Sequence, residues 1–429
     1  MQRFDVIIVG AGPAGSTAGL LLARAGLSVL IVERGQVAGQ KNVSGGILYS
    51  ALVNEILPNF MEKAPLERAI TNHQLVILSD HRSVSLEFRN EEASQNVYPS
   101  FSVLRAKFDP WLASQAEEAG AMLITGVTVD SLWMKDGKVI GIQAGPDQLE
   151  ADVVMIAEGT KSLLLKQAGL REEFYPRDVS LGVKEIISLP EQVIEERFQC
   201  SPTTGTAYTL LGHTLGIEGG GFIYTNRDTL SVGVVVKIES LYKNNTQPHQ
   251  VLDEFKSHPL VKRLTLGGDI VEYSAQTVHR GGFHLLSRLY GDGFVVIGSA
   301  ARLLFNNIFA LRGMDFAIAS ASAAAKAILS AKEKGSYSSN ELSVYADLLK
   351  QSSIYKDWST FKNTYSLLEN KRLFNNYPDI ITETLESLFK PTTKPTPKLM
   401  ETLRMELKNK VSFVDLMADI YQISRGFIL

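Results

Sequence analysis

The chain has 429 residues, of which 45% are hydrophobic and 21% are charged, and its formal net charge at pH 7 is −3. This composition is typical of a globular protein with a large core in two or three structural units, and it gives no basic surface for nucleic acid. The single cysteine, Cys200, excludes an intramolecular disulfide, a CxxC redox pair and a four-cysteine iron–sulfur cluster in this chain, and it indicates a reducing compartment.

The first thirty residues predict one βαβ unit. Residues 4–9 are apolar and β-branched, as in a buried parallel strand, residues 16–25 predict a helix closed by Gly26, and residues 28–33 predict a second strand. Because the first strand begins at about Phe4, we expect no cleavable signal ahead of it. No uninterrupted apolar run reaches the roughly 18–20 residues that a membrane span needs.

The loop between the first strand and the helix has the pattern of a dinucleotide-binding turn. Gly10 allows the tight turn, Gly12 lets backbone approach a pyrophosphate, and Gly15 lets the helix pack closely on the sheet. The start of the helix offers unpaired N–H groups and a partial positive charge to phosphate. Glu33, at the end of the next strand, is placed to accept hydrogen bonds from the adenosine ribose hydroxyls.

The rest of the chain alternates between sheet and helix patterns. Residues 34–100 look mixed and loop-rich. The next expected elements are a helix over 108–119, a strand over 121–124, a hairpin over 126–150 with its turn at 135–137, and a buried strand over 152–157. Beyond these we expect an antiparallel sheet within 180–276, a strand over 294–297, a long helix over 313–329, and helices over 340–429 with a break at 391–398.

These elements predict an α/β protein with a Rossmann-type, glutathione-reductase-like FAD-binding domain, an inserted antiparallel β-sheet substrate domain and a helical C-terminal region. The predicted boundaries are 1–179 with 277–335 for the first domain, 180–276 for the inserted domain and 336–429 for the helical region. The glycine loop alone does not separate FAD from NAD. The further sheet strands that end near 159 and 298, and the absence of a second GxGxxG pattern, favour FAD.

The chain resembles the electron-transfer-flavoprotein–quinone oxidoreductases, in particular the short bacterial FixC-like branch that lacks its own ferredoxin domain. The resemblance covers nearly the whole chain. It is carried by Gly10–Gly15 with Glu33, and by Lys41–Gly46, Ser102–Arg105, Lys107–Asp109, Glu158–Ser162, Leu181–Glu185, Gly219–Asn226, Glu272–Ala275 and Leu311–Asp315.

The resemblance implies FAD as the cofactor, an electron-transfer flavoprotein as electron donor, a quinone as acceptor and a separate ferredoxin-like partner. It implies a cytoplasmic protein, with peripheral contact to the inner face of the membrane as an option. The residues expected to contact FAD are Gly10, Ala11, Gly12, Pro13, Ala14, Gly15, Glu33, Arg34, Gly45, Gly46, Arg105, Val127, Glu158, Gly159, Gly298, Ser299, Gly313 and Met314.

Several of these positions have a specific expected role. Arg105 would be a fixed cation near the flavin or its phosphates, Gly45–Gly46 would pass close under the isoalloxazine, and Gly159 would approach the pyrophosphate. Gly313 opens the long helix, whose dipole would favour negative charge on the ring. Each position also fits a plain structural role, as a helix start or an ordinary turn. The run Gly220–Tyr224 is either a wall of a quinone channel or a core strand.

The chain departs from the family pattern in one region. The family usually has Gly-Asp-Ala-Ala-Gly where this chain has Gly298-Ser-Ala-Ala-Arg302, and Ile308 stands where a glycine is usual. The Asp normally accepts a hydrogen bond from the ribityl chain, and Ser299 accepts one without charge, so we expect FAD to bind more weakly than in relatives, by about tenfold or more.

The expected chemistry needs no protein nucleophile, so we name no catalytic acid or base and no metal ligand. Lys184 and Glu185 are candidates only by family position, and we expect His279 and His284 at the surface.

Two other interpretations of the function stay open. The chain could be a different flavin enzyme of this fold, such as an NAD(P)H-dependent hydroxylase or a prenyl reductase, or a weakly active FAD-binding relic. The apolar segment 413–429 is expected to pack as a terminal helix or to contribute to membrane contact.

Overall fold

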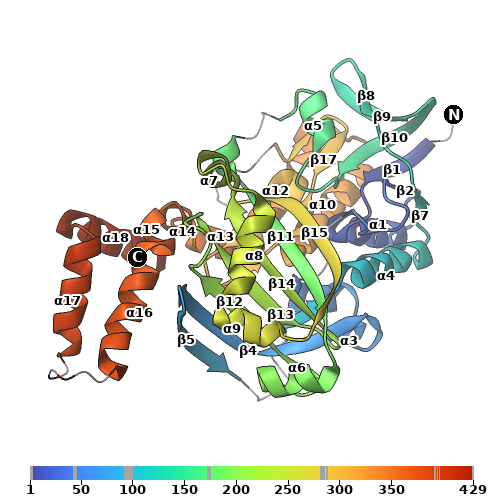
Figure 1. Ribbon diagram of the computed structural model, residues 1–429. Coiled ribbons are helices and arrows are strands. Elements are labelled where there is room, and N and C mark those ends of the chain that lie inside the picture. The colour runs from blue at the N-terminus through green and yellow to red at the C-terminus, as the bar shows by residue number, and fades with distance from the viewer. Residues whose placement is uncertain are drawn as a thin grey trace.

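A computed structural model describes residues 3–41, 46–90, 100–171, 175–280, 286, 288–390, 393, 395 and 397–427. Two sheets lie side by side, and helices of the C-terminal part extend to one side of the second sheet (Figure 1). The predicted arrangement of a first sheet, a second sheet and a helical C-terminal region is the one observed.

The first sheet is built around a buried parallel core. Its strands are ordered β16-β17-β10-β1-β2-β7, with the hairpin β8–β9 joined to β10. Ile7 pairs with Val154 on one side and with Leu30 on the other, and all three side chains are fully buried. The bounds are β1 (Arg3–Val9), β2 (Val29–Glu33), β7 (Met122–Thr125), β8 (Ser131–Lys135), β9 (Lys138–Ala144), β10 (Asp147–Ile156), β16 (Tyr290–Gly291) and β17 (Phe294–Val296).

Three helices accompany this sheet: α1 (Pro13–Arg24), α4 (Arg105–Glu118) and α10 (Met314–Glu333). A side-chain carbon on Gly19 would lie 2.5 Å from Ile31 Cδ1, which shows how closely α1 packs on the sheet. Helix α10 is long and apolar enough to cross a membrane by length and composition, but it lies mostly buried in the core of the protein. The predicted hairpin turn is confirmed, because Asp136 and Gly137 both have positive φ, as a two-residue type I′ turn requires.

The second sheet has nine strands in the described chain, ordered β15-β11-β14-β13-β12-β4-β6-β3, with β5 paired to β4. Most pairs are antiparallel, as predicted, but β12 and β4 run parallel. The bounds are β3 (Gly46–Tyr49), β4 (Leu66–Ser79), β5 (Arg82–Arg89), β6 (Ser100–Val103), β11 (Val179–Ser188), β12 (Thr204–Leu211), β13 (Gly219–Thr225), β14 (Thr229–Lys237) and β15 (Asp269–His279).

Strands β3 to β6 correct two predictions. Residues 34–100 were expected to be loop-rich, and residues 1–179 were assigned wholly to the first domain, whereas the strands between 46 and 103 belong to the second sheet. The physical reason is that β4 packs Val76 and Leu78 into the same core as Phe255. The other boundaries stay predictions.

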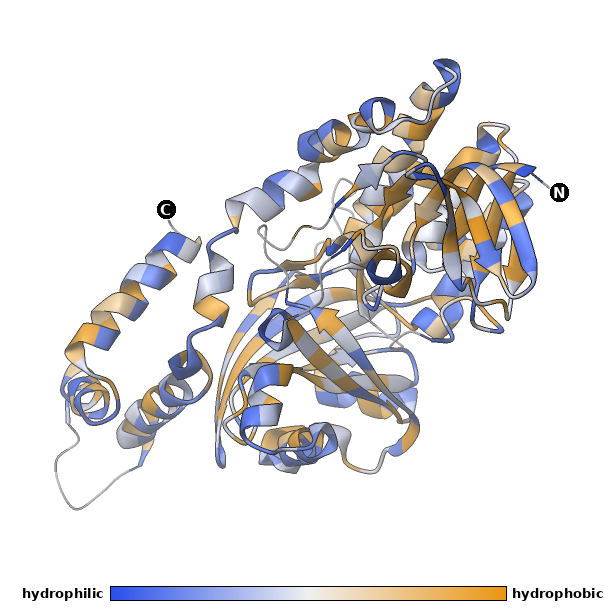
Figure 2. Cartoon of the chain, turned by 90° about the horizontal axis from the view of Figure 1, so that it is seen from above, coloured by the Kyte–Doolittle hydropathy of each residue, from blue (hydrophilic) through white to orange (hydrophobic). Residues whose placement is uncertain are grey.

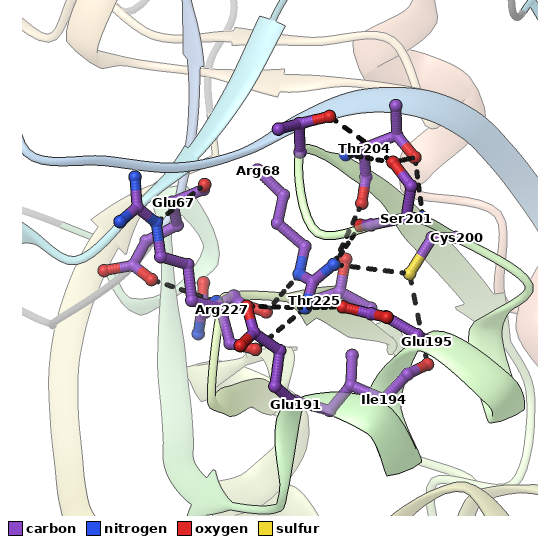
Figure 3. A network of polar contacts seen from close by, with 12 residues as sticks. Glu67, Arg68, Glu191, Ile194, Glu195, Cys200, Ser201, Thr204, Thr225 and Arg227 are labelled. Carbon is purple, nitrogen blue, oxygen red and sulfur yellow. Dashed lines mark hydrogen bonds and ion pairs between the residues drawn. The ribbon is translucent and has the colours of Figure 1, made fainter.

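A buried arginine connects β4 to the later strands (Figure 3). The Arg68 side chain is fully buried and donates to the carbonyl oxygens of Asn226 (2.7 Å), Arg227 (2.9 Å) and Ser201, and it lies 3.4 Å from Glu195. Since these partners lie on α6 and the β13–β14 turn and in the loop before β12, one side chain joins segments that are far apart in sequence.

The remaining elements are helical. Helices α6, α8 and α9 supply the apolar residues that cover one face of the second sheet. The bounds are α2 (Ala51–Ile56), α3 (Phe60–Lys63), α5 (Leu163–Gln167), η1 (Pro176–Asp178), α6 (Glu191–Phe198), α7 (Ile238–Lys243), α8 (Pro248–Ser257), α9 (Pro259–Thr265), η3 (Gly298–Ala301), α11 (Ser339–Leu342), α12 (Val344–Gln351), α13 (Ser353–Thr360), α14 (Thr364–Leu368), α15 (Lys371–Phe374), α16 (Asn376–Phe389), α17 (Leu399–Lys410) and α18 (Phe413–Phe427), with two short strands, β18 (Phe305–Asn306) and β19 (Leu311–Arg312).

Candidate functional site

The loop between β1 and α1 is tightly packed at Gly10 and Gly15 and accessible at Gly12. A side-chain carbon on Gly15 would lie 1.8 Å from the carbonyl oxygen of Gly10, and one on Gly10 would lie 2.6 Å from that of Ala157. On Gly12, by contrast, the one described atom within 4 Å would be Nη2 of Arg105, at 3.6 Å. Gly10 and Gly15 therefore serve the fold, and Gly12 leaves a face that a dinucleotide can approach.

The carboxylate of Glu33 is directed at this loop. It is buried, and it accepts hydrogen bonds from the N–H groups of Ala11 (2.9 Å) and Gly35 (2.7 Å). Its oxygens still have lone pairs for ribose hydroxyls. The N–H of Val127 donates to the backbone oxygen of Glu33 (3.1 Å), so Val127 lies beside it, while the side chain of Arg34 is exposed.

Arg105 is held at the mouth of the loop. Its guanidinium donates two hydrogen bonds to the carboxylate of Asp109, at 3.1 and 2.5 Å, and Asp109 is fully buried. Gly39, with a φ of +80°, comes so close that a side-chain carbon there would lie 2.6 Å from Cβ of Asp109. Because Asp109 fixes Arg105, the cation faces Gly12 in one orientation.

Glu158 and Gly159 have different surroundings. The carboxylate of Glu158 accepts a hydrogen bond from the N–H of Leu164 (3.0 Å) at the start of α5, and burial raises its pKa. Gly159 has a φ of +77°, and no described atom lies within 4 Å of where its side-chain carbon would be. The backbone at Gly159 is therefore accessible, whereas the Glu158 side chain serves α5.

The turn at Gly298 packs against the first turn of α1. Gly298 has a φ of +62°, a side-chain carbon there would lie 3.0 Å from Cβ of Ala14, and its N–H donates to Oγ of Ser320 (2.9 Å). Ser299 follows within the same short helix, η3. Arg302 ends η3 in the left-handed conformation, with a φ of +63°. Arg302, which stands where the family usually has glycine, therefore has a backbone conformation that favours glycine.

His279 corrects a prediction. It was expected at the surface, but it ends β15 and is only 3% exposed. Burial and the neighbouring charges of Arg302 and Arg171 lower its pKa to about 3. His284 and Gly45 lie outside the described residues.

The N-terminus of α10 meets β3. Gly313 caps the helix, and a side-chain carbon on Gly46 would lie 3.4 Å from Cε of Met314, so three predicted residues come together here. Arg312 donates to Asp315 and lies over the ring of Tyr49, with its guanidinium carbon 5.0 Å from the ring centre. This contact fixes the wall between the helix start and β3.

A cavity of about 140 Å³ lies beside this point, against the face of the second sheet. Gly220, Gly221, Phe222 and Tyr224 line it, while Ile223 belongs to the core. The strand therefore borders a cavity and also contributes Ile223 to the core, and its role as a wall of a quinone channel stays a prediction. Further lining comes from Ile47, Tyr49, Leu211, Val235, Lys237, Arg280, Ile308, Phe309, Leu368 and Phe374.

Two cations bind the C-terminal helices onto the rim of this cavity. Nζ of Lys237 lies 2.7 Å from Oε2 of Glu369, and Arg280 donates both to Glu369 and to the carbonyl oxygen of Leu368 (2.9 Å). Leu368 and Phe374 therefore line the cavity from helices that follow the sheet in sequence.

The two charged residues on β11 have different surroundings. Lys184 is fully buried, its pKa is lowered to about 7 by burial, and the charges of Glu272 and Arg105 act on it. Glu185 instead forms an ion pair with Lys256 on α8 (2.6 Å).

Sequence reasoning gave no role to Asp109, and it missed Tyr49, Glu369 and the two rim cations. The i,i+4 spacing of Arg105 and Asp109 is a signal that could have found the first of them. The contacts of Glu369 join segments more than 80 residues apart, and local patterns do not report such pairs.

The glycine loop, the acid at the end of β2 and the cavity against the second sheet define an FAD-dependent oxidoreductase. Comparison with known families agrees, with matches to FAD dependent oxidoreductase over residues 5–169, to ETF-QO, ubiquinone-binding over 179–278, and to ETF-QO/FixC family C-terminal domain over 364–428. The chain belongs to the FixC and electron-transfer-flavoprotein–quinone oxidoreductase family. Its cofactor is FAD, and it acts with an electron-transfer flavoprotein and a quinone.

Relatives match over almost the whole chain. Protein FixC of Escherichia coli K12 is 42% identical over 417 residues, 97% of each chain. The "Probable electron transfer flavoprotein-quinone oxidoreductase YdiS" of the same strain is 40% identical, again over 97% of each chain. Protein FixC of Azorhizobium caulinodans is 37% identical over 99% of each chain.

Solved structures show the same fold at low identity. A geranylgeranyl bacteriochlorophyll reductase-like protein of Thermoplasma acidophilum has a TM-score of 0.73 at 21% identity, over 99% of this chain and 100% of that one. A flavoprotein/dehydrogenase of Cytophaga hutchinsonii has a TM-score of 0.64 at 18% identity, over 98% and 99%. At these identities the likeness concerns the fold alone.

Proposed function

We propose that the quinone ring binds in the cavity of the second sheet. The observation that carries the proposal is that residues close in sequence to Gly46 and Gly313, which belong to the predicted FAD site, line the cavity. Ile47, which directly follows Gly46, and Tyr49 line the cavity, and Ile308 and Phe309 line it shortly before Gly313. A group bound between Gly46 and the start of α10 would therefore border a molecule in the cavity.

We propose that the residues gathered around the loop hold FAD. The open face at Gly12 and the first N–H groups of α1 suit the pyrophosphate, Glu33 suits the ribose, and Arg105 suits a phosphate charge. Bound FAD would take electrons from the donor protein and pass them to the quinone. The N-terminus of α10 places a partial positive charge beside Met314, which favours negative charge nearby.

We propose that a separate ferredoxin-like protein completes the electron path. The single cysteine of this chain cannot supply the ligands of a cluster. Any such cluster would have to come from a partner protein.

We propose that the protein works on the cytoplasmic side and contacts the membrane through α18. The helix has an outer apolar face, made of Phe413, Val414, Met417, Ile420 and Tyr421, each 49–78% exposed. These residues repeat at helical spacing, so they share one side of the helix. Figure 2 shows hydrophobic and hydrophilic segments alternating along the C-terminal helices.

The inner side of α18 is polar. Asp419 is 1% exposed and accepts hydrogen bonds from Arg372 (2.7 Å), Asn370 (2.6 Å) and Tyr377 (2.5 Å). A helix that buries its acid and exposes its apolar residues suits a lipid surface better than water. At its other end the ring of Phe427 lies 5.5 Å from that of Phe309, which lines the cavity, so the outer apolar face leads towards the site of a lipid-dissolved quinone.

The experiment mixes purified FAD-loaded protein, reduced electron-transfer flavoprotein and a short-tailed quinone without oxygen, with and without the ferredoxin-like partner. We expect the quinone to be reduced and the absorbance of oxidised flavin to return. A fully flavinylated protein that leaves the quinone oxidised in both mixtures would rule the proposal out. Rapid reduction by NADPH alone would favour the other flavin enzymes of this fold.

A further inference from the structure

Ile308 has a backbone conformation that its side chain disfavours. Its φ is +75°, in the left-handed region, where a β-branched residue is a rare outlier. Its side chain also lines the cavity of the second sheet. Strained residues of this kind are enriched at functional sites, so the conformation of Ile308 indicates a functional role.

The surrounding turn imposes this conformation. Ile308 lies between β18 and β19, where Oδ1 of Asn306 accepts its N–H (3.1 Å) and Oδ1 of Asn307 accepts the N–H of Ala310 (2.8 Å). The hydroxyl of Thr364 on α14 donates to the carbonyl oxygen of Asn306 (3.2 Å). Three side chains thus hold the turn in place, and Ile308 is not free to relax into the right-handed region.

A glycine would adopt this φ without strain, but it would leave the cavity wider. The cavity has a volume of about 140 Å³, and its wall on β13 is already made partly of Gly220 and Gly221. The Ile308 side chain therefore reduces the volume of the cavity, although the backbone of the turn would accept a smaller residue at this position.

We propose that Ile308 is a specificity-determining residue that limits the ring accepted by the cavity, so that single-ring quinones bind in preference to fused two-ring quinones. The inference rests on the proposed quinone site. One methylene more or less in a hydrophobic pocket changes specificity by roughly 10–200-fold, so one isoleucine side chain in the partly apolar lining of this cavity is sufficient for such an effect.

The test compares Ile308→Gly, Ile308→Ala and the wild type with a short-tailed benzoquinone and a short-tailed naphthoquinone. The flavin is first reduced with dithionite, and its reoxidation by each quinone is followed by stopped flow, so the donor protein is not needed. Leu215→Gly is the matched control, because Leu215 also has a positive φ (+54°) and is 47% exposed, but does not line the cavity. A second readout is the rise in melting temperature that each quinone causes in the oxidised protein.

In the wild type we expect the benzoquinone to reoxidise the flavin faster. In Ile308→Gly the rate ratio should move by about tenfold or more towards the naphthoquinone, with a smaller shift in Ile308→Ala and none in Leu215→Gly. An unchanged ratio in Ile308→Gly, or an equal shift in Leu215→Gly, would overturn the inference while leaving the quinone site intact. If neither quinone reoxidises the flavin or raises the melting temperature in any variant, the quinone site itself is wrong.

Discussion

The guanidinium of Arg105 and the carboxylate of Asp109 form a two-point ion pair across one turn of α4, with the acid fully buried and the cation facing Gly12. Since a hydrogen bond to a charged group contributes about 1.5–3 kcal/mol, we expect Arg105→Gln to weaken FAD binding by about tenfold or more. Asp109→Asn should also weaken FAD binding, because the guanidinium of Arg105 loses the carboxylate that orients it. The double variant should bind no worse than Arg105→Gln alone, as flavin titration of the apoprotein will show; fully additive losses would mean that Asp109 acts elsewhere.

The glycines of the loop should separate folding from binding. Gly12→Ala places its new carbon 3.6 Å from Arg105 Nη2, so the apoprotein should keep its melting temperature but lose flavin. Gly15→Ala places its carbon 1.8 Å from a backbone oxygen, so it should fold poorly with or without FAD. Thermal melts and flavin content of both variants check this. Equal losses of stability would contradict the assignment of Gly12 to the ligand.

Arg68 should contribute strongly to stability. Arg68→Met removes a fully buried cation from its carbonyl and carboxylate partners, and breaking a buried pair costs about 3–5 kcal/mol. The free energy of unfolding in urea measures the loss. Arg89→Met is the control, because Arg89 also pairs with an acid and a carbonyl but is 26% exposed, and it should cost about 1 kcal/mol or less. A similar small cost at Arg68 would show that the buried network is dispensable.

His279 should make the protein less stable in mild acid. Its pKa is about 3 in the folded protein, whereas an unperturbed histidine titrates near 6.5. Between these values the unfolded chain binds more protons, so the free energy of unfolding falls as pH drops from about 6.5 towards 3. His279→Gln should flatten this slope by about 1.4 kcal/mol per pH unit. His258, whose pKa is about 4, should keep its own contribution in that variant, and an unchanged slope would show that His279 is not held neutral.

The outer apolar face of α18 should bind lipid. Met417→Glu with Ile420→Glu places two charges on that face, and because each side chain contributes about 1.5–3 kcal/mol when buried, binding to vesicles should fall at least tenfold. Sedimentation with liposomes measures this. Leu266→Glu is the control, an equally exposed apolar residue distant in sequence from α18. If both proteins sediment like the wild type, the membrane contact lies elsewhere.

The two halves of the molecule differ in how far the sequence predicts them. The β1–α1–β2 unit and its acid Glu33 follow from local patterns within thirty residues. Strand β4 does not, because Glu67, Arg68 and Asn72 are buried in it and disrupt the alternation that marks a strand. Its partner β12 lies more than 130 residues later, so no turn signal connects the two.

The same pairing has a consequence for how the chain is made. Strand β4 leaves the ribosome long before β12, and Arg68 meets the carbonyl of Asn226 only after a further 158 residues. The first sheet waits still longer, since β17 begins at Phe294 and pairs with β10. Contacts so distant in sequence form slowly, and the early strands stay exposed meanwhile. A nascent chain of this protein should therefore not complete both sheets until about three hundred residues have been synthesised.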